Sequence, residues 1–140
     1  MKITTIISAL FVMLMMVSCA NHFTTVSTEK KIDTRLIGTW AGAETDKQIE
    51  GFHKSWEMVR NADGTFKLDF KFNQNGTMQQ VLESGSWWVE NGKFYEYHNE
   101  SKKTDIYEYT VLNNDQVKFK SRDISVGMNT DSYEFIDHRK

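Results

Sequence analysis

The segment 65–72 constrains the fold more than any other stretch of this chain, because polar and apolar residues alternate along it without exception. It reads Thr-Phe-Lys-Leu-Asp-Phe-Lys-Phe, so every second side chain is apolar. Successive side chains of a β-strand point to opposite faces, so this pattern predicts a strand with one buried face and one face in water. The chain must supply further strands to cover the apolar face.

Turn signals divide the rest of the chain into such strands. Asn75-Gly76 and Asn91-Gly92 favour the positive φ angles of a type I′ turn, so each pair predicts a tight hairpin. Longer turns rich in Asn and Asp are expected at 61–64 and 113–115. Together these signals predict about eight strands, near residues 36–43, 53–60, 65–73, 77–90, 93–100, 104–112, 116–124 and 130–137.

Consecutive hairpins without a helical period between them favour an all-β, up-and-down antiparallel barrel. A barrel of about eight strands encloses either a filled core or one small ligand. The segment 77–90 is long, so we expect Gly85 to mark a bulge or a bend in it. A membrane-spanning barrel is disfavoured because the faces opposite the aromatic residues are charged, at Lys67, Asp69, Lys71, Lys118 and Lys120.

Hairpin register predicts which side chains face the lumen. Around Asn75-Gly76, Phe72 should lie opposite Gln79 and Phe70 opposite Val81, and around Asn91-Gly92, Val89 should face Phe94 and Trp87 should face Glu96. The candidate ligand-binding residues of the lumen are Trp56, Met58, Phe66, Leu68, Phe70, Phe72, Val81, Trp87, Phe94, Glu96, His98 and Phe119, and Val117, Tyr133 and Phe135 share their face. A mainly apolar interior with a few polar groups is typical of ligand pockets.

The first residues form a second strong signal. Lys2 precedes the apolar run 3–17, which closes on Ser18-Cys19, and this order of charged, apolar and small residues is typical of a signal peptide. The run is shorter than the roughly 20 residues that a membrane-spanning helix needs, which disfavours a permanent anchor helix. An ordinary secretory signal that leaves a free Cys19 is the other alternative.

The segment Met16-Val17-Ser18-Cys19 resembles the bacterial lipobox, although Met stands where Leu is usual. The resemblance implies that Cys19 is acylated by fatty acids such as palmitate and anchors the protein to a membrane of the cell envelope. Ala20 resembles the pattern that directs such proteins to the outer membrane of a Gram-negative cell. The expected organisation is a signal peptide at 1–18, the lipidated Cys19 with a flexible tether at 19–35, and a barrel domain at 36–140.

Composition excludes several kinds of function. Without the leader, 16 Lys and Arg face 19 Asp and Glu, a net charge of −3 that does not favour nucleic acid binding. The four histidines are scattered and have no cysteine partners, so they do not predict a zinc site. The chain also lacks a phosphate-binding glycine loop and a nucleophile elbow, so we expect neither a metal nor a cofactor.

Several short motifs together resemble a lipocalin-like bacterial lipoprotein of the calycin group. They are Leu36-Ile37-Gly38-Thr39-Trp40, similar to the Gly-x-Trp of the first lipocalin strand, the segments 72–77 and 85–92, and the closing Tyr133-Glu134-Phe135. The resemblance implies that Gly38, Trp40 and Arg139 are structural, with the arginine packed on the tryptophan at one end of the barrel. The chain departs from the family in having no helix after the last strand. The usual Thr-Asp-Tyr loop is matched only in part, by residues 104–107 and 130–133.

The leading hypothesis is a lipoprotein without catalytic activity whose barrel binds a small hydrophobic ligand, such as a fatty acid or a lipid fragment. This hypothesis depends largely on the fold, and one fold hosts many functions. The alternative is a protein-interaction or inhibitor module with a filled core, whose partner the sequence does not identify. A third hypothesis is an enzyme that uses Glu96 and His98 as an acid–base pair. The space left in the lumen distinguishes the first two.

Overall fold

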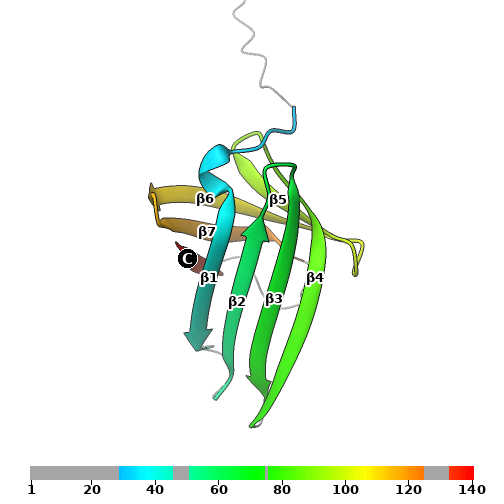
Figure 1. The fold of residues 1–140 in the computed structure, drawn as a ribbon, viewed down its shortest axis with the longest axis vertical. Helices are drawn as coiled ribbons and strands as arrows, with labels where there is room; N and C mark the ends of the chain where they lie inside the picture. Colours follow the sequence, from blue (N-terminus) through cyan, green and yellow to red (C-terminus); the bar gives the residue numbers. More distant parts are fainter. Residues whose placement is uncertain (1–28, 46–50, 75, 125–132) are drawn as a thin grey trace, which may run out of the picture.

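The computed structural model describes residues 29–45, 51–74, 76–124 and 133–140, which form a closed antiparallel barrel of eight strands (Figure 1). The elements are the 3₁₀ helix η1 (Thr34–Leu36) and the strands β1 (Gly38–Thr45), β2 (His53–Arg60), β3 (Thr65–Gln74), β4 (Thr77–Glu90), β5 (Lys93–His98), β6 (Thr104–Asn113), β7 (Gln116–Asp123) and β8 (Glu134–Arg139). Each strand pairs with the next, and β8 pairs with β1. The predicted up-and-down barrel is therefore confirmed.

The predicted strand bounds agree closely with those in the structure, because the bounds depend on the residues of the local turns. β2 and β4 begin and end at the expected residues, whereas β1 and β8 each end two residues later than expected. Asn91 and Gly92 have φ angles of 51° and 73°, the positive values that a type I′ turn requires. Asn75 and the residues 130–132 of the predicted last strand lie outside the described residues.

The bulge, one of the two roles expected for Gly85, is absent. The ladder that β4 forms with β3 runs through this residue without a shift of register, and the ladder with β5 begins at it, with Gly85 opposite His98. The glycine is needed for another reason, because a Cβ atom built at Gly85 would lie 1.8 Å from the carbonyl oxygen of Tyr97. The irregularities of register lie instead in β6, between Ile106 and Tyr107 and between Val111 and Asn113. Gly85 therefore permits a close approach of two backbones.

The register confirms the expected inner face of the barrel. The four predicted pairs are present: Phe72 with Gln79, Phe70 with Val81, Val89 with Phe94, and Trp87 with Glu96. Because β4 contains no bulge, its odd-numbered residues stay on the inner face along its whole length.

Strands β1 to β4 are paired over a longer distance than the rest of the barrel. β5 pairs with only residues 85–90 of β4, and β8 pairs with only Trp40 and Ala41 of β1. Below this level β1 to β4 continue as a curved four-stranded sheet, as Figure 1 shows. We call the part enclosed by all eight strands the closed half, and the part lined by the lower ends of β1 to β4 the open half.

The hydrophobic core lies in the closed half. Its buried members are Leu36, Trp40, Met58, Phe66, Trp87, Phe94, Tyr107, Val117 and Phe119. In the open half the inner-facing side chains are less covered, and Val81 is 40% exposed.

Residues 31–35, which belong to the predicted tether, contact the barrel. The backbone of Lys31 exchanges two hydrogen bonds with Val89, of 2.9 and 2.7 Å. The Tyr109 hydroxyl donates a hydrogen bond of 2.9 Å to the Asp33 carboxylate, which also accepts from Arg35. The predicted signal peptide and Cys19 lie outside the described residues.

The contact expected between Trp40 and Arg139 is present at one end of the barrel. The Arg139 guanidinium lies 4.2 Å from the centre of the Trp40 ring, within the range of a cation–π contact. The same guanidinium donates to the carbonyl oxygens of Ile37, Arg35 and Asn114 at 2.8 to 2.9 Å. A Cβ atom at Gly38 would lie 2.6 Å from Arg139 Nη1, so glycine leaves room for the arginine.

Candidate functional site

The residues predicted to line the lumen all share the inner face, but they divide between the two halves. Those in the closed half are buried: Met58, Phe66, Trp87, Phe94, Glu96, His98 and Phe119. Those further toward the open half are half-buried or exposed: Trp56, Leu68, Phe70, Phe72 and Val81. Only the second group is accessible from solvent, so it is the candidate ligand surface.

Aromatic rings fill the closed half. The ring centroid of Phe94 lies 5.1 Å from that of Phe119, 5.9 Å from that of Trp87 and 6.3 Å from that of Tyr107. These separations are those of aromatic pairs in direct contact. The closed half is therefore packed as a core by the side chains that the sequence suggested as a cavity lining.

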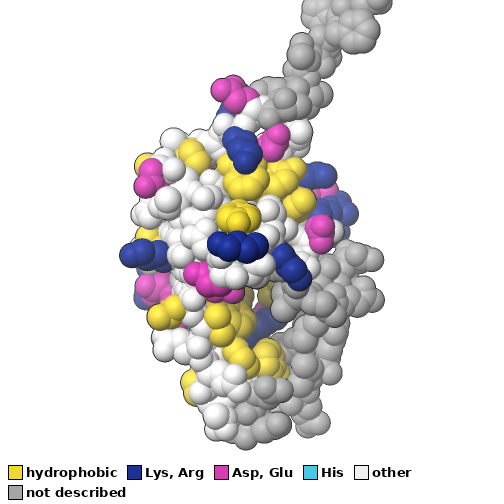
Figure 2. Space-filling view, turned by 90° about the vertical axis from the view of Figure 1, so that its right-hand side faces the viewer, with side chains coloured by type: hydrophobic (Ala, Val, Ile, Leu, Met, Phe, Trp, Pro, Cys, Tyr) yellow, Lys and Arg dark blue, Asp and Glu magenta, His cyan; other side chains and the backbone are white. Residues whose placement is uncertain are grey.

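The open half carries an aromatic wall, which we define as the inner-facing Trp56, Phe70 and Phe72. Phe70 and Phe72 have ring centroids 5.9 Å apart, and Trp56 meets Phe135 edge to face at 5.3 Å. Figure 2, which views the side of the molecule where β4 lies, shows hydrophobic side chains gathered around a hollow in its lower part. A concave apolar surface of this kind suits an apolar ligand.

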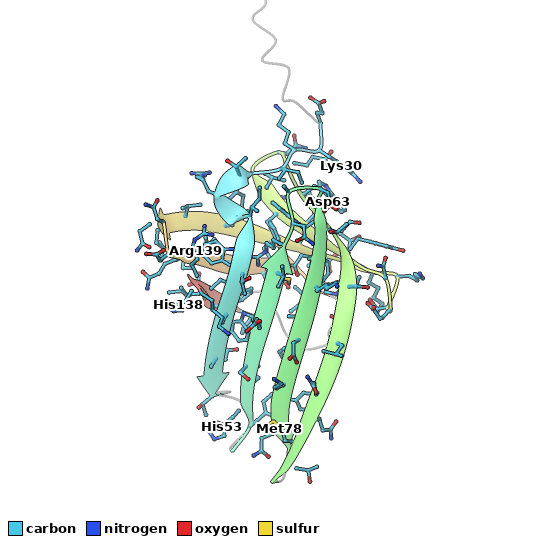
Figure 3. All side chains as sticks on the ribbon, in the orientation of Figure 1. Lys30, His53, Asp63, Met78, His138 and Arg139 are labelled. Atoms are coloured by element: carbon cyan, nitrogen blue, oxygen red, sulfur yellow. The ribbon has the colours of Figure 1, made fainter. Side chains whose placement is uncertain are left out.

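Charged residues border the aromatic wall at its lower end. Lys54 Nζ lies 2.6 Å from Glu44 Oε1 and 4.4 Å from the centre of the Tyr133 ring, and the Tyr133 hydroxyl donates to Glu44. A hollow of about 420 Å³ lies at the same end of the sheet, but most of its lining belongs to the outer face: Ala43, Thr45, His53, Ser55, Lys71 and Met78 point outward, and only Glu44 and Lys54 of its lining face inward. Figure 3 shows His53 and Met78 at this end, far from Lys30 and Asp63. The inner face of the open half therefore changes from apolar side chains to charged side chains toward its lower end.

An ion pair that the sequence did not predict lies in the closed half. Arg60 Nη2 donates to Asp137 Oδ2 at 2.7 Å, and both side chains are almost fully buried. Asp137 Oδ1 accepts a second hydrogen bond of 2.7 Å from Trp56 Nε1. A buried charge is tolerated only where such partners compensate for its loss of hydration.

Arg60 also contacts aromatic rings. Its guanidinium carbon lies 5.0 Å from the ring centres of both Phe94 and Phe119, so the cation is placed between two aromatic rings. Nε and Nη1 of Arg60 have no hydrogen-bond partner among the described residues. Asp137 is therefore the principal counter-ion of Arg60, because Glu96 Oε1 lies further away, at 3.7 Å.

His98 lies among three carboxylates. Its Nδ1 is 2.9 Å from Glu83 Oε2, and its Nε2 is 3.4 Å from Asp105 Oδ2 and 3.9 Å from Glu96 Oε2. Burial by itself would lower the pKa of His98, but Asp105, Glu83 and Glu96 outweigh it and raise the pKa to about 10. The imidazole is therefore positively charged at neutral pH.

Glu96 titrates close to neutrality. Burial raises the pKa of Glu96 to about 7, against the opposing effect of Arg60 and His98. Glu96 and His98 therefore belong to one buried charge network that also includes Arg60 and Asp105.

One signal in the sequence could have located this network. Arg60 follows Trp56 and Met58 at a spacing of two, and Asp137 follows Tyr133 and Phe135 in the same way, so strand alternation places both on the inner face. Charged residues are rarely buried without a partner, and the two are 77 residues apart in the chain. Alternation shows the face of each residue, but it does not show which residue is its partner.

Comparisons with protein-family models and with curated proteins find no match for this chain. In the part of the chain that the structure describes, no three His, Cys, Asp or Glu side chains are grouped so that they could hold a metal ion. The described ranges likewise contain no helix whose length and hydrophobicity would let it cross a membrane.

Proposed function

We propose that this protein is a lipid-anchored protein of the cell envelope, on the outer membrane in a Gram-negative cell, whose open half binds a small hydrophobic molecule without catalysis. A fatty acid or a lipid fragment is the class of ligand that fits. The observation that carries the ligand-binding part of this proposal is the aromatic wall, because Trp56, Phe70 and Phe72 face the lumen and yet remain partly exposed. The anchor is supported by the resemblance of residues 16–19 to the lipobox.

The shape of the wall supports an elongated, amphipathic ligand. An acyl chain would lie against Phe70 and Phe72, and its polar end would reach the charged residues Lys54 and Glu44. Burial of apolar surface contributes roughly 25 cal/mol per Å², so even a short acyl chain gains several kcal/mol from such a wall. Binding without catalysis is supported by the burial of Glu96 and His98 away from the wall.

The Leu68→Trp variant tests ligand binding. Leu68 is half-buried between Met58 and Glu83, where the closed half meets the open half. The larger indole should occupy the space of the ligand, so we expect the affinity for an environment-sensitive fluorescent fatty acid to fall by about tenfold or more, which corresponds to ~1.4 kcal/mol. Overpacking should cost ~1 to 3 kcal/mol of stability. The measurement is a titration read through the emission of the probe itself.

Leu112→Trp is the matched control, because Leu112 is 46% exposed and the substitution adds the same indole outside the lumen. This variant should bind the probe as the wild type does. Equal binding by Leu68→Trp and Leu112→Trp would contradict a ligand site in the open half.

A protein-interaction or inhibitor module is the second candidate. The observation in its favour is that the closed half is filled by Phe94, Phe119 and their neighbours, so the barrel holds no ligand there. A folded wild-type protein that shows no saturable binding of the fatty-acid probe would favour this candidate.

The Cys19→Ala variant tests the anchor. Without the thiol no acyl group can be attached, so we expect the protein to lose its membrane attachment or to accumulate as an uncleaved precursor. Membrane fractionation and the mass of the N-terminal peptide report these outcomes. Asn21→Ala, which changes a neighbour that carries no lipid, should behave as the wild type does. Normal processing and attachment of Cys19→Ala would exclude the lipoprotein assignment.

A further inference from the structure

The lower part of β4 has a free edge. β3 pairs with β4 on one side, but β5 pairs with it only from Gly85 onward. Just below Gly85, the edge is closed at Ser84, whose N–H lies 3.1 Å from a Glu100 carboxylate oxygen and whose carbonyl accepts a hydrogen bond of 2.9 Å from Asn99. Among the described residues, no strand pairs with this edge of residues 77–83.

Strand geometry shows which backbone groups are unpaired there. In an antiparallel strand the N–H and C=O of successive residues point to opposite sides. The backbone N–H and C=O groups of Ser84 point away from β3. Met78, Gln80 and Leu82 are separated from Ser84 by even numbers of residues, so their N–H and C=O groups point the same way. These three residues therefore offer N–H and C=O groups to another strand.

The edge lacks the usual protection against such pairing. Exposed edges are commonly protected by charged residues, proline or a bulge. The segment 77–82 reads Thr-Met-Gln-Gln-Val-Leu and has none of these. The one charged residue of the edge, Glu83, faces the lumen, where it lies 2.9 Å from His98 Nδ1. Met78 and Leu82 are 65% and 67% exposed and are the most exposed large hydrophobic residues of the described chain.

The opposite edge of the same sheet differs. There, the lower end of β1 carries Glu44, which is paired with Lys54 at 2.6 Å and accepts a hydrogen bond from Tyr133. A strand added beside β1 would have to lie next to the charged Glu44 and the Tyr133 side chain that contacts it. Of the two edges, the β4 edge is the one that suits an added strand.

We propose that the β4 edge pairs with the β4 edge of a second copy of this chain, antiparallel and centred on Gln80. A two-fold axis at Gln80 places Met78 opposite Leu82 of the second copy, and the reverse pair forms on the other side of the axis. Each of these pairs is a hydrogen-bonded pair that exchanges two N–H···O bonds. The four-stranded sheets of the two copies then form one continuous sheet.

The sequence of the edge is complementary to itself in this register. The pairing brings the exposed Met78 and Leu82 side chains together on the outer face, where both lose apolar surface to solvent. It places Glu83 opposite Thr77 and not opposite another carboxylate, so no like charges meet across the interface. A partner with a charged or proline-containing strand would lack this match.

The register gives a specific test by cysteine cross-linking. Residues opposite each other in a hydrogen-bonded pair have Cα atoms about 5.5 Å apart, which suits a disulfide. The two copies of Gln80 meet this condition, whereas the two copies of Met78 are offset by four residues, or about 13 Å. A cysteine at 80 should therefore cross-link, and a cysteine at 78 alone should not.

The experiment uses the purified full chain in detergent, oxidised with copper phenanthroline and separated on a non-reducing gel. We expect a covalent dimer, reversed by dithiothreitol, from Gln80→Cys and from the double variant Met78→Cys/Leu82→Cys. Wild type reports any background from Cys19, and Leu112→Cys reports collisional cross-linking at another exposed site. Gln80 is an exposed residue whose side chain donates a hydrogen bond to the Asp69 carboxylate, so the substitution should leave the fold intact, which circular dichroism checks.

Two outcomes would overturn the proposal. One is a Gln80→Cys protein that is folded and reacts with a thiol reagent but gives no more dimer than Leu112→Cys. The other is a Met78→Cys single variant that cross-links as efficiently as Gln80→Cys, which would indicate random encounters. As an independent measure, Met78→Lys/Leu82→Lys should lose the dimer in light scattering, and an unchanged mass would also exclude this interface.

Discussion

Asp137→Ala is expected to lower the free energy of unfolding by about 3 to 5 kcal/mol, the usual cost of leaving a buried charge without its partner. Asp137 is fully buried and accepts hydrogen bonds of 2.7 Å from both Arg60 and Trp56. Among the described residues, its removal leaves the Arg60 guanidinium with Glu96, at 3.7 Å, as its remaining carboxylate partner. Denaturant unfolding at constant pH measures the effect.

Two further variants separate the loss of the ion pair from a general loss of packing. Asp123→Ala removes an exposed carboxylate from the end of β7 and should change stability by no more than about 0.5 kcal/mol. The double variant Arg60→Met/Asp137→Leu replaces the pair with apolar side chains and should recover most of the lost stability. If Asp137→Ala lowers the free energy of unfolding by no more than Asp123→Ala does, the buried ion pair does not stabilise the fold.

Trp40→Ala is expected to cost a similar amount, about 3 to 5 kcal/mol, because it empties the space of a large buried side chain. Trp40 is fully buried, and its Nε1 donates to the Leu36 carbonyl at 2.8 Å. Arg139, which covers the ring at 4.2 Å, would lose its cation–π contact as well. Chemical denaturation gives the stability, and the fatty-acid probe should still bind because Trp40 lies in the closed half.

Trp88→Ala is the matched control for Trp40. Trp88 lies on the outer face of β4, where its ring stacks on Tyr95 at 5.2 Å and lies beneath Lys30. Its loss removes one aromatic pair without opening a cavity in the core, so the cost should be about 0.5 to 1.5 kcal/mol. A Trp40→Ala variant no less stable than Trp88→Ala would contradict the structural role of Trp40.

Local chemistry was enough to predict the strands and their inner face. The alternation at Phe66, Leu68, Phe70 and Phe72 allows only one face to be buried, and each Asn-Gly pair sets the register of its own hairpin. Both signals act between neighbours in the chain, so no knowledge of distant contacts was needed. The sequence did not reveal the close backbone contact of Gly85, because that contact depends on the approach of Tyr97 from another strand.

The candidate site needed the tertiary structure. The sequence placed Phe94, Phe119 and Phe70 in one lumen, but only the unequal pairing of the strands separates a filled closed half from an open half with an aromatic wall. Arg60 and Asp137 can share the core only because β2 and β8 bring them within 2.7 Å across 77 residues of chain. The sequence by itself determined the strands and their faces, since these depend on a period of two and on turns. The tertiary structure decided which inward-facing residues are covered, paired or accessible, because those properties depend on strand lengths and on contacts between distant residues.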